Sequence, residues 1–216
     1  SETALSLGQP EVDNLLKVAA QVGFSVARSQ AGTEVRALDL TAANLAVSAK
    51  GWLRSAGSEL DATLRFDDLR TLGPAYRGSL TGQARVTGTP ENGALTLEAT
   101  GSNLAIGQVQ ADRMLAGKSQ LALALRTENG ALRIDRADLS NPQLSVKATG
   151  QATNGRRQID LSARLTDLGL FVPEFPGALT VAGRAVDDGA GYVLDLRGTG
   201  PGPVSYTHLT LPTKRI

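Results

Sequence analysis

The chain has 216 residues, of which 41% are hydrophobic and only 4% aromatic. Lys and Arg number 22 against 21 Asp and Glu, and the resulting net charge of +1 gives no electrostatic basis for binding nucleic acid. The absence of cysteine excludes disulfides and thiolate metal sites, while the apolar content is too high for a disordered chain.

Two copies of one sequence pattern occupy most of the chain. Residues 5–101 align without gaps to residues 104–200 at an offset of 99. Roughly a quarter of the aligned positions are identical, against about 7% expected from average residue usage. This match divides the chain into a first β-repeat, residues 1–103, and a second β-repeat, residues 104–203.

Within each repeat, apolar and polar residues alternate with the period of two that puts successive side chains on opposite faces of a β-strand. The alternation is clearest over 119–126, and Asn129-Gly130 then indicates a tight hairpin turn into 131–136. In chain order, the predicted strands are 44–51, 59–66, 79–87, 94–100, 119–126, 131–136, 143–150, 158–165, 178–186 and 192–198.

Four segments interrupt this alternation. Residues 12–20 and 111–116 have helix-like spacing with an Asp near the start, whereas 68–74 and 167–173 end at a proline, before which any helix must stop. The pattern therefore predicts a mainly all-β fold: a long antiparallel, meandering sheet built from tandem repeats, with short helical caps. Such a sheet has to curl, because open twisted sheets rarely exceed ~10 strands.

The strand alternation collects aliphatic side chains into one long stripe. Its usual fate is a closed sandwich or solenoid core. The chain has few aromatic residues and no long amphipathic helix to cover so many strands, which favours an open, U-shaped β-groove lined by the stripe. The predicted groove-facing residues are Phe24, Val26, Leu45, Val47, Leu60, Leu64, Phe66, Leu80, Leu95, Leu97, Leu121, Leu123, Leu125, Leu132, Ile134, Leu144, Val146, Ile159, Leu161, Leu165, Leu179, Val181, Leu194 and Leu196.

The sequence offers few candidate catalytic residues. Outside residues 204–216 there is no histidine or cysteine, so only carboxylates remain as candidates. The pairs Asp67-Asp68 and Asp187-Asp188 are expected in turns and helix caps, because neighbours on a strand point to opposite faces. We therefore expect a protein that is not an enzyme, with no catalytic residue, metal site or cofactor.

Four arginines recur at the repeat offset, as the pairs Arg65/Arg164 and Arg85/Arg184. Their recurrence is compatible with contacts to lipid phosphates. It is also typical of a solvated outer strand face that discourages pairing between sheets, which is the interpretation we favour.

The ends of the chain are atypical. Residues 204–216 resemble the conceptual translation of a sequencing adapter, and we treat them as an artefact that also accounts for His208, the only histidine. No apolar run approaches the ~18 residues of a membrane span. The chain starts at Ser1 without a leader, so we expect both ends to be cut edges of a longer parent protein.

Three patterns recur in both repeats. In the first repeat they are Leu-x-Leu-Gly-x-x-x-Val-Asp-x-Leu-Leu over 5–16, Asp-Leu-x-x-x-x-Leu-x-Val-x-Ala-x-Gly over 39–51, and Asp-Leu-x-x-x-x-Pro-x-x-x-Gly-x-Leu-Thr over 68–81. This unit resembles the TamB branch (translocation and assembly module) of the AsmA-like superfamily, and the resemblance covers residues 5–200.

The resemblance implies a folded-over β-sheet with a lipid-lining groove, in the periplasm of a Gram-negative bacterium. It implies phospholipid acyl chains as the ligand and a role in phospholipid transport to, and assembly of, the outer membrane. The parent protein would be anchored in the inner membrane and would engage an outer-membrane barrel protein. The alternative left open by the residues themselves is a structural or adhesive β-solenoid, in which the same stripe is sealed in a closed core.

Overall fold

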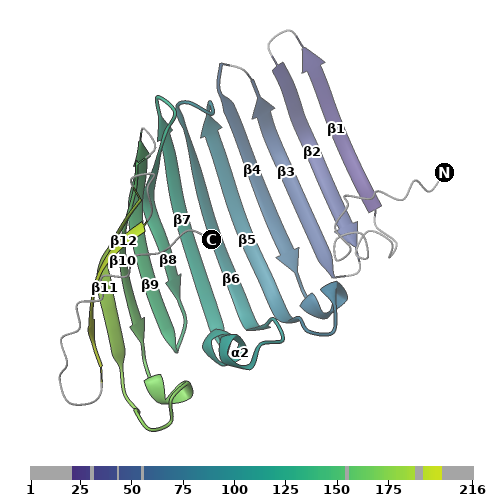
Figure 1. Cartoon of the computed structure of the whole chain (residues 1–216). Helices are drawn as coiled ribbons and strands as arrows, with labels where there is room; N and C mark the ends of the chain where they lie inside the picture. Colours follow the sequence, from purple (N-terminus) through teal and green to yellow (C-terminus); the bar gives the residue numbers. More distant parts are fainter. Residues whose placement is uncertain are drawn as a thin grey trace.

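In the computed structural model, one antiparallel sheet accounts for most of the chain (Figure 1). The structure describes residues 21–29, 32–42, 44–54, 56–153, 156–187 and 192–200. Within them, twelve strands lie side by side in the order of the sequence, from β1 to β12. The expected helix at 12–20, the adapter-like residues 204–216 and Asp188 lie outside the described residues.

The strands are long for their type, most of them having nine or more residues. Short helices follow three of them: 3₁₀-helices η1 (Leu69–Leu72) and η2 (Leu168–Leu170), and α-helix α2 (Val109–Leu115). The strands are β1 Gln21–Ser29, β2 Gly32–Ala42, β3 Leu45–Leu53, β4 Ser58–Phe66, β5 Arg77–Gly88, β6 Gly93–Ala105, β7 Lys118–Glu128, β8 Ala131–Ser140, β9 Leu144–Thr153, β10 Arg156–Leu165, β11 Leu179–Asp187 and β12 Tyr192–Thr199.

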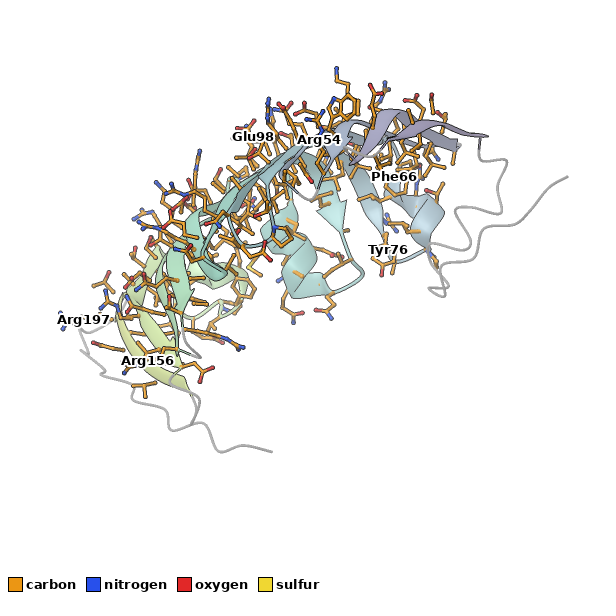
Figure 2. The ribbon with its side chains drawn as sticks, turned by 90° about the horizontal axis from the view of Figure 1, so that it is seen from above. Arg54, Phe66, Tyr76, Glu98, Arg156 and Arg197 are labelled. Carbon is orange, nitrogen blue, oxygen red and sulfur yellow. The ribbon has the colours of Figure 1, made fainter. Side chains whose placement is uncertain are left out.

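The predicted fold class is confirmed: the protein is mainly β, and its single sheet curls without closing into a barrel (Figures 1 and 2). All ten strands expected from the alternation are present. The pattern gave no bounds for β1 and β2, which the structure adds at the start of the sheet. The short helices expected within 68–74, 111–116 and 167–173 are also present.

The two ends of the strands carry different connections. At one end, the hairpin edge, the turns are short, as between β7 and β8, where Asn129 and Gly130 have φ of 52° and 77°. These positive values are the ones that a two-residue hairpin requires and that Asn-Gly tolerates. The opposite end, the helix edge, carries η1, α2 and η2 (Figure 1).

Two aspartates separated by the repeat offset begin the 3₁₀-helices in the same way. Asp68 Oδ1 accepts a hydrogen bond from the backbone N–H of Arg70 at 3.0 Å, and Asp167 Oδ1 accepts one from Gly169 at 2.9 Å. Asp167 Oδ1 also accepts the N–H of Gly177 at 2.8 Å, which ties the end of the loop to its beginning. Side-chain caps of this kind satisfy backbone donors that the helix leaves unpaired.

The Asp167 cap leads to a pH-dependent prediction. The N–H donors of Gly177 and Gly169 lower the pKa of Asp167. The charged carboxylate therefore stabilises the fold above the unfolded-state pKa of ~3.9. This stabilisation is lost as the pH falls through the lower pKa of the native state. Asp167→Asn should therefore unfold at lower urea concentration than the wild type at pH 7. The difference in unfolding midpoint between the variant and the wild type should become smaller towards pH 3. A difference that stays constant with pH would contradict this role of Asp167.

Glycines at two points let neighbouring strands approach closely. A Cβ atom added at Gly51 would overlap the carbonyl oxygen of Glu59 on β4, and one added at Gly183 would overlap that of Asp195 on β12. Gly51 also has φ of 146°, which disfavours other residues. Both glycines occupy the concave side of the sheet described below, so their missing side chains permit tight curvature there.

Candidate functional site

Strand pairing aligns the apolar residues into rows that cross the whole sheet. In the middle of the strands, Leu123 of β7 lies between Leu97 of β6 and Ala137 of β8. The central row formed by such partners contains only apolar residues and one glycine: Phe24, Leu38, Ala49, Ala62, Ala84, Leu97, Leu123, Ala137, Ala148, Leu161, Gly183 and Leu196.

Two further rows flank the central row on the same face. The row towards the helix edge is Val22, Leu40, Val47, Leu64, Gly82, Ala99, Leu121, Leu139, Val146, Ala163, Val181 and Gly198. The row towards the hairpin edge is Val26, Val35, Gly51, Leu60, Val86, Leu95, Leu125, Ile134, Gly150, Ile159, Ala185 and Leu194. Neither row contains a polar side chain.

A fourth row, the capped row, lies next to the helices. It comprises Ala42, Leu45, Phe66, Leu80, Gly101 and Ser119 on β2 to β7, and Leu144, Leu165 and Leu179 on β9 to β11. We call the four rows together the apolar face. By register, every predicted groove-facing residue belongs to it except Leu132, which continues the same face one position nearer the hairpin edge. For Phe24, the structure describes the strand position but not the side chain.

The apolar face is the inner side of the curve. Figure 2 shows Phe66 and Tyr76 inside the curved ribbon and Arg54 and Glu98 outside it. Only the capped row is well covered, since Phe66, Ala42 and Leu165 are 6%, 8% and 9% exposed. The short helices lie at this end of the sheet, and no second sheet covers the face among the described residues.

Outside the capped row, every row of the apolar face has an exposed member, such as Leu121 at 36% and Leu38 at 38%. Val86 and Ile159 are each 38% exposed, Leu132 is 41% and Val26 is 50% exposed. Monomeric soluble proteins rarely leave large contiguous apolar surfaces in water. A concave apolar face that is buried along its helix edge and partly accessible elsewhere can bind a long apolar ligand.

The outer face carries most of the charged strand residues, many of them in ion pairs. Arg184 Nε donates to Asp160 Oδ1 at 2.6 Å, and this hydrogen bond lowers the pKa of Asp160. The recurring arginines all lie on this face by register: Arg85 pairs with Glu59, and Arg65 pairs with Asp67 at 2.8 Å. The arginines thus occupy the solvated outer strand face, on the opposite side of the sheet from the apolar rows.

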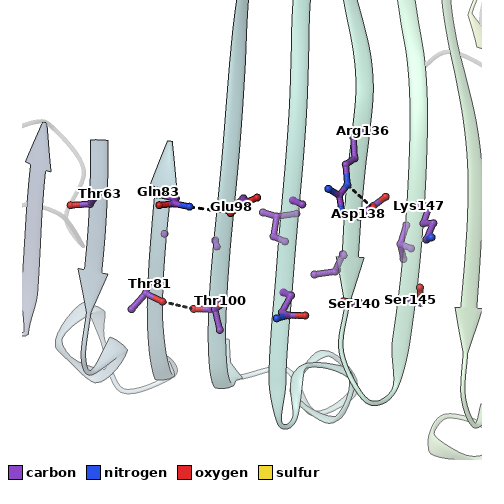
Figure 3. A pocket seen from close by; sticks show the side chains of 17 residues that line it. Thr63, Thr81, Gln83, Glu98, Thr100, Arg136, Asp138, Ser140, Ser145 and Lys147 are labelled. Carbon is purple, nitrogen blue, oxygen red and sulfur yellow. Dashed lines mark hydrogen bonds and ion pairs between the residues drawn. The ribbon is translucent and has the colours of Figure 1, made fainter. Parts of the chain in front are cut away.

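A shallow hollow of about 750 Å³ lies on the outer face (Figure 3). Its polar lining is largely self-paired: Gln83 Nε2 donates to Glu98 at 3.0 Å, and Arg136 Nε donates to Asp138 at 2.7 Å. No residue pattern in the sequence marks this hollow, because its lining comes from several strands that are brought together only by the pairing of the sheet. Its polar lining residues lie on the outer face, and Leu121, Leu139 and Val146 of the apolar face also contribute to the lining.

The carboxylates considered as catalytic candidates serve as caps and ion-pair partners. Asp68 and Arg70 form an ion pair at 2.7 Å, whose hydrogen bonds lower the pKa of Asp68. Asp68 and Asp167 cap separate helices, one after β4 and the other after β10. The described residues contain no group of three or more His, Cys, Asp or Glu side chains placed to hold a metal ion. Within the same ranges, no helix is long and apolar enough to cross a membrane.

Comparison with known proteins identifies no relative. No protein-family model, curated protein or solved structure matches the chain.

Proposed function

We propose that the apolar face shields the acyl chains of phospholipids and that the protein is a non-catalytic part of a lipid conduit. One observation carries the proposal: apolar rows run without a polar interruption across twelve strands on the inner side of an open, curved sheet. A sealed core would leave these rows dry, whereas Val86 and Ile159 are each 38% exposed and Val26 is 50% exposed.

The energetics of lipid transfer support this role. Exposing an acyl chain costs ~0.8 kcal/mol per methylene, so a chain of about 16 carbons costs about 13 kcal/mol in water. Twelve strands spaced ~4.8 Å apart give an apolar path of about 53 Å, which is longer than a bilayer is thick. Chains can slide along such a path without chemistry, because every position offers similar aliphatic contacts.

The cellular setting of the proposal comes from the sequence resemblance to the TamB branch. It places the groove in the periplasm of a Gram-negative bacterium, in a longer protein anchored in the inner membrane. The lipid flow would supply the outer membrane, and an outer-membrane barrel protein would be the partner. An unbroken sheet built from repeats suits this setting, since added repeats lengthen the path across the periplasm.

Photocrosslinking from neighbouring positions tests the proposal. A benzophenone amino acid at Leu123 or Leu161 should capture phospholipid, because both positions lie in the central row. The same group at Ala124 or Ser162 should capture little, because the adjacent residues of a strand point to the outer face. Equal capture from both faces, or capture from neither, would contradict a lipid-binding inner face.

A further inference from the structure

The apolar face differs between its helix edge and its hairpin edge, and the proposed function does not specify how a lipid lies relative to them. Along β10 it presents Leu165, Ala163, Leu161 and Ile159, and then Arg157 at the hairpin edge. Along β7 the same face ends at Thr127, along β4 at Ser58 and along β11 at Asp187. Four positions without a polar side chain on β4, β10 and β11, and three on β7, are thus followed by a polar residue at the hairpin edge. We call Ser58, Thr127, Arg157 and Asp187 the polar border. Between its members, Leu132 and Ala152 continue the apolar face on β8 and β9, and at the helix edge Ser119 is the polar member of the capped row.

The helix edge differs from the hairpin edge because its apolar side chains are buried. Phe66 and Leu165 are buried there, and the backbone is tied down by polar contacts. Asn141 Nδ2 donates to the carbonyl oxygen of Met114 at the end of α2 at 2.8 Å, and Arg113 Nη1 of α2 donates to the carbonyl oxygen of Leu170 in η2 at 3.0 Å. These bonds link α2 to the turn between β8 and β9 and to η2, so the helix edge is covered, whereas Ile159 and Leu132 near the hairpin edge are exposed.

The width of the apolar face matches one lipid tail. From Leu165 to Ile159 the strand advances six residues, or about 20 Å at ~3.4 Å per residue. Half of a bilayer's ~30 Å hydrocarbon core is about 15 Å, so an acyl chain lying along the strands fits between the helices and the polar border.

The polar border carries both signs of charge. Arg157 Nη1 and Asp187 Oδ2 lie 3.8 Å apart, and the two side chains are 64% and 14% exposed. An exposed guanidinium can donate to a phosphate, and a neighbouring carboxylate suits an ammonium group. The border therefore has the chemistry of a zwitterionic phospholipid headgroup.

Resting on the proposed function, we infer that phospholipids enter tail first from the hairpin edge and lie along the strands. The methyl ends of the tails reach the helix-capped row, and the headgroups remain beside Ser58, Thr127, Arg157 and Asp187. In the alternative arrangement, the tails run perpendicular to the strands. Headgroups and methyl ends would then contact each row of the apolar face equally often.

Fluorescence quenching tests this orientation in the full chain, whose lack of native cysteine allows single-site labelling. A small fluorophore is attached to Ile159→Cys near the hairpin edge, to Leu179→Cys in the capped row, or to Ser162→Cys on the outer face as a control. The probe is phosphatidylcholine bearing a nitroxide either on the headgroup or near the methyl end of one tail.

We expect the headgroup nitroxide to quench most of the fluorescence at position 159 and little at position 179, and the tail nitroxide to reverse this order. Equal quenching at both positions, or the opposite order, overturns the inferred orientation but leaves lipid binding intact. Failure of both nitroxides to quench either inner-face label above the Ser162→Cys control overturns the orientation and the proposed function together.

Discussion

Leu123→Asp should reduce phospholipid binding on the order of 100-fold while leaving the protein folded. In the empty protein the carboxylate can stay hydrated, because Leu123 lies on an open face. When a tail covers it, the charge must lose water without a partner, which costs several kcal/mol, and each ~1.4 kcal/mol weakens binding tenfold. Lipid titration measures the loss, and circular dichroism reports the fold.

Ala124→Asp is the matched control for this variant. Ala124 is the next residue of β7, and its pairing partner is Arg136 of β8. A carboxylate at position 124 would therefore lie beside a cation on the outer face. Lipid binding and stability should both stay close to the wild type. If Leu123→Asp instead unfolds the protein, losing ~3–5 kcal/mol as expected for an unpaired charge in a sealed core, the open-face account is wrong.

Phe66→Ala should lower the free energy of unfolding by ~3–5 kcal/mol, because it removes a buried aromatic side chain and leaves a cavity. Phe66 is 6% exposed and pairs with Leu45 and Leu80 in the capped row. The loss should appear in urea denaturation as a lower midpoint with an unchanged slope, which indicates lost stability within the same fold.

Val86→Ala provides the comparison in the row near the hairpin edge. Val86 is 38% exposed, so its truncation should cost only about 1 kcal/mol. The ratio of the two losses measures how unevenly the apolar face is covered. Similar losses at Phe66 and Val86 would mean that the whole face is sealed, as in a closed solenoid.

The fold could be predicted from the sequence wherever the determinants are local. The turn at Asn129-Gly130 is set by two residues that tolerate positive φ, and the strand before it is set by strict alternation over 119–126. The first hairpin was harder, because the pairing shifts between Ser25 and Val26 and again between Val35 and Leu38. Such bulges insert a residue and break the period of two on which the prediction depends.

The site was predictable as a set of residues but not as a shape. Alternation alone assigned Leu121, Leu123 and Leu125 to one face, and the pairing of the strands aligns them with their neighbours. Which rows are buried depends on where the helices pack, and this is a tertiary property. The burial of Ser119, which accepts a hydrogen bond from Asn141 Nδ2 at 3.3 Å, has no sequence signal for the same reason.

Mass spectrometry of lipids that remain with the purified protein shows whether the apolar face holds phospholipid. The protein and its Leu123→Asp and Ala124→Asp variants are produced in a Gram-negative host, purified in parallel and extracted. We expect phospholipid in the wild type and in Ala124→Asp, and its near absence from Leu123→Asp. Equal amounts of lipid in all three samples, or none in the wild type, would contradict this expectation.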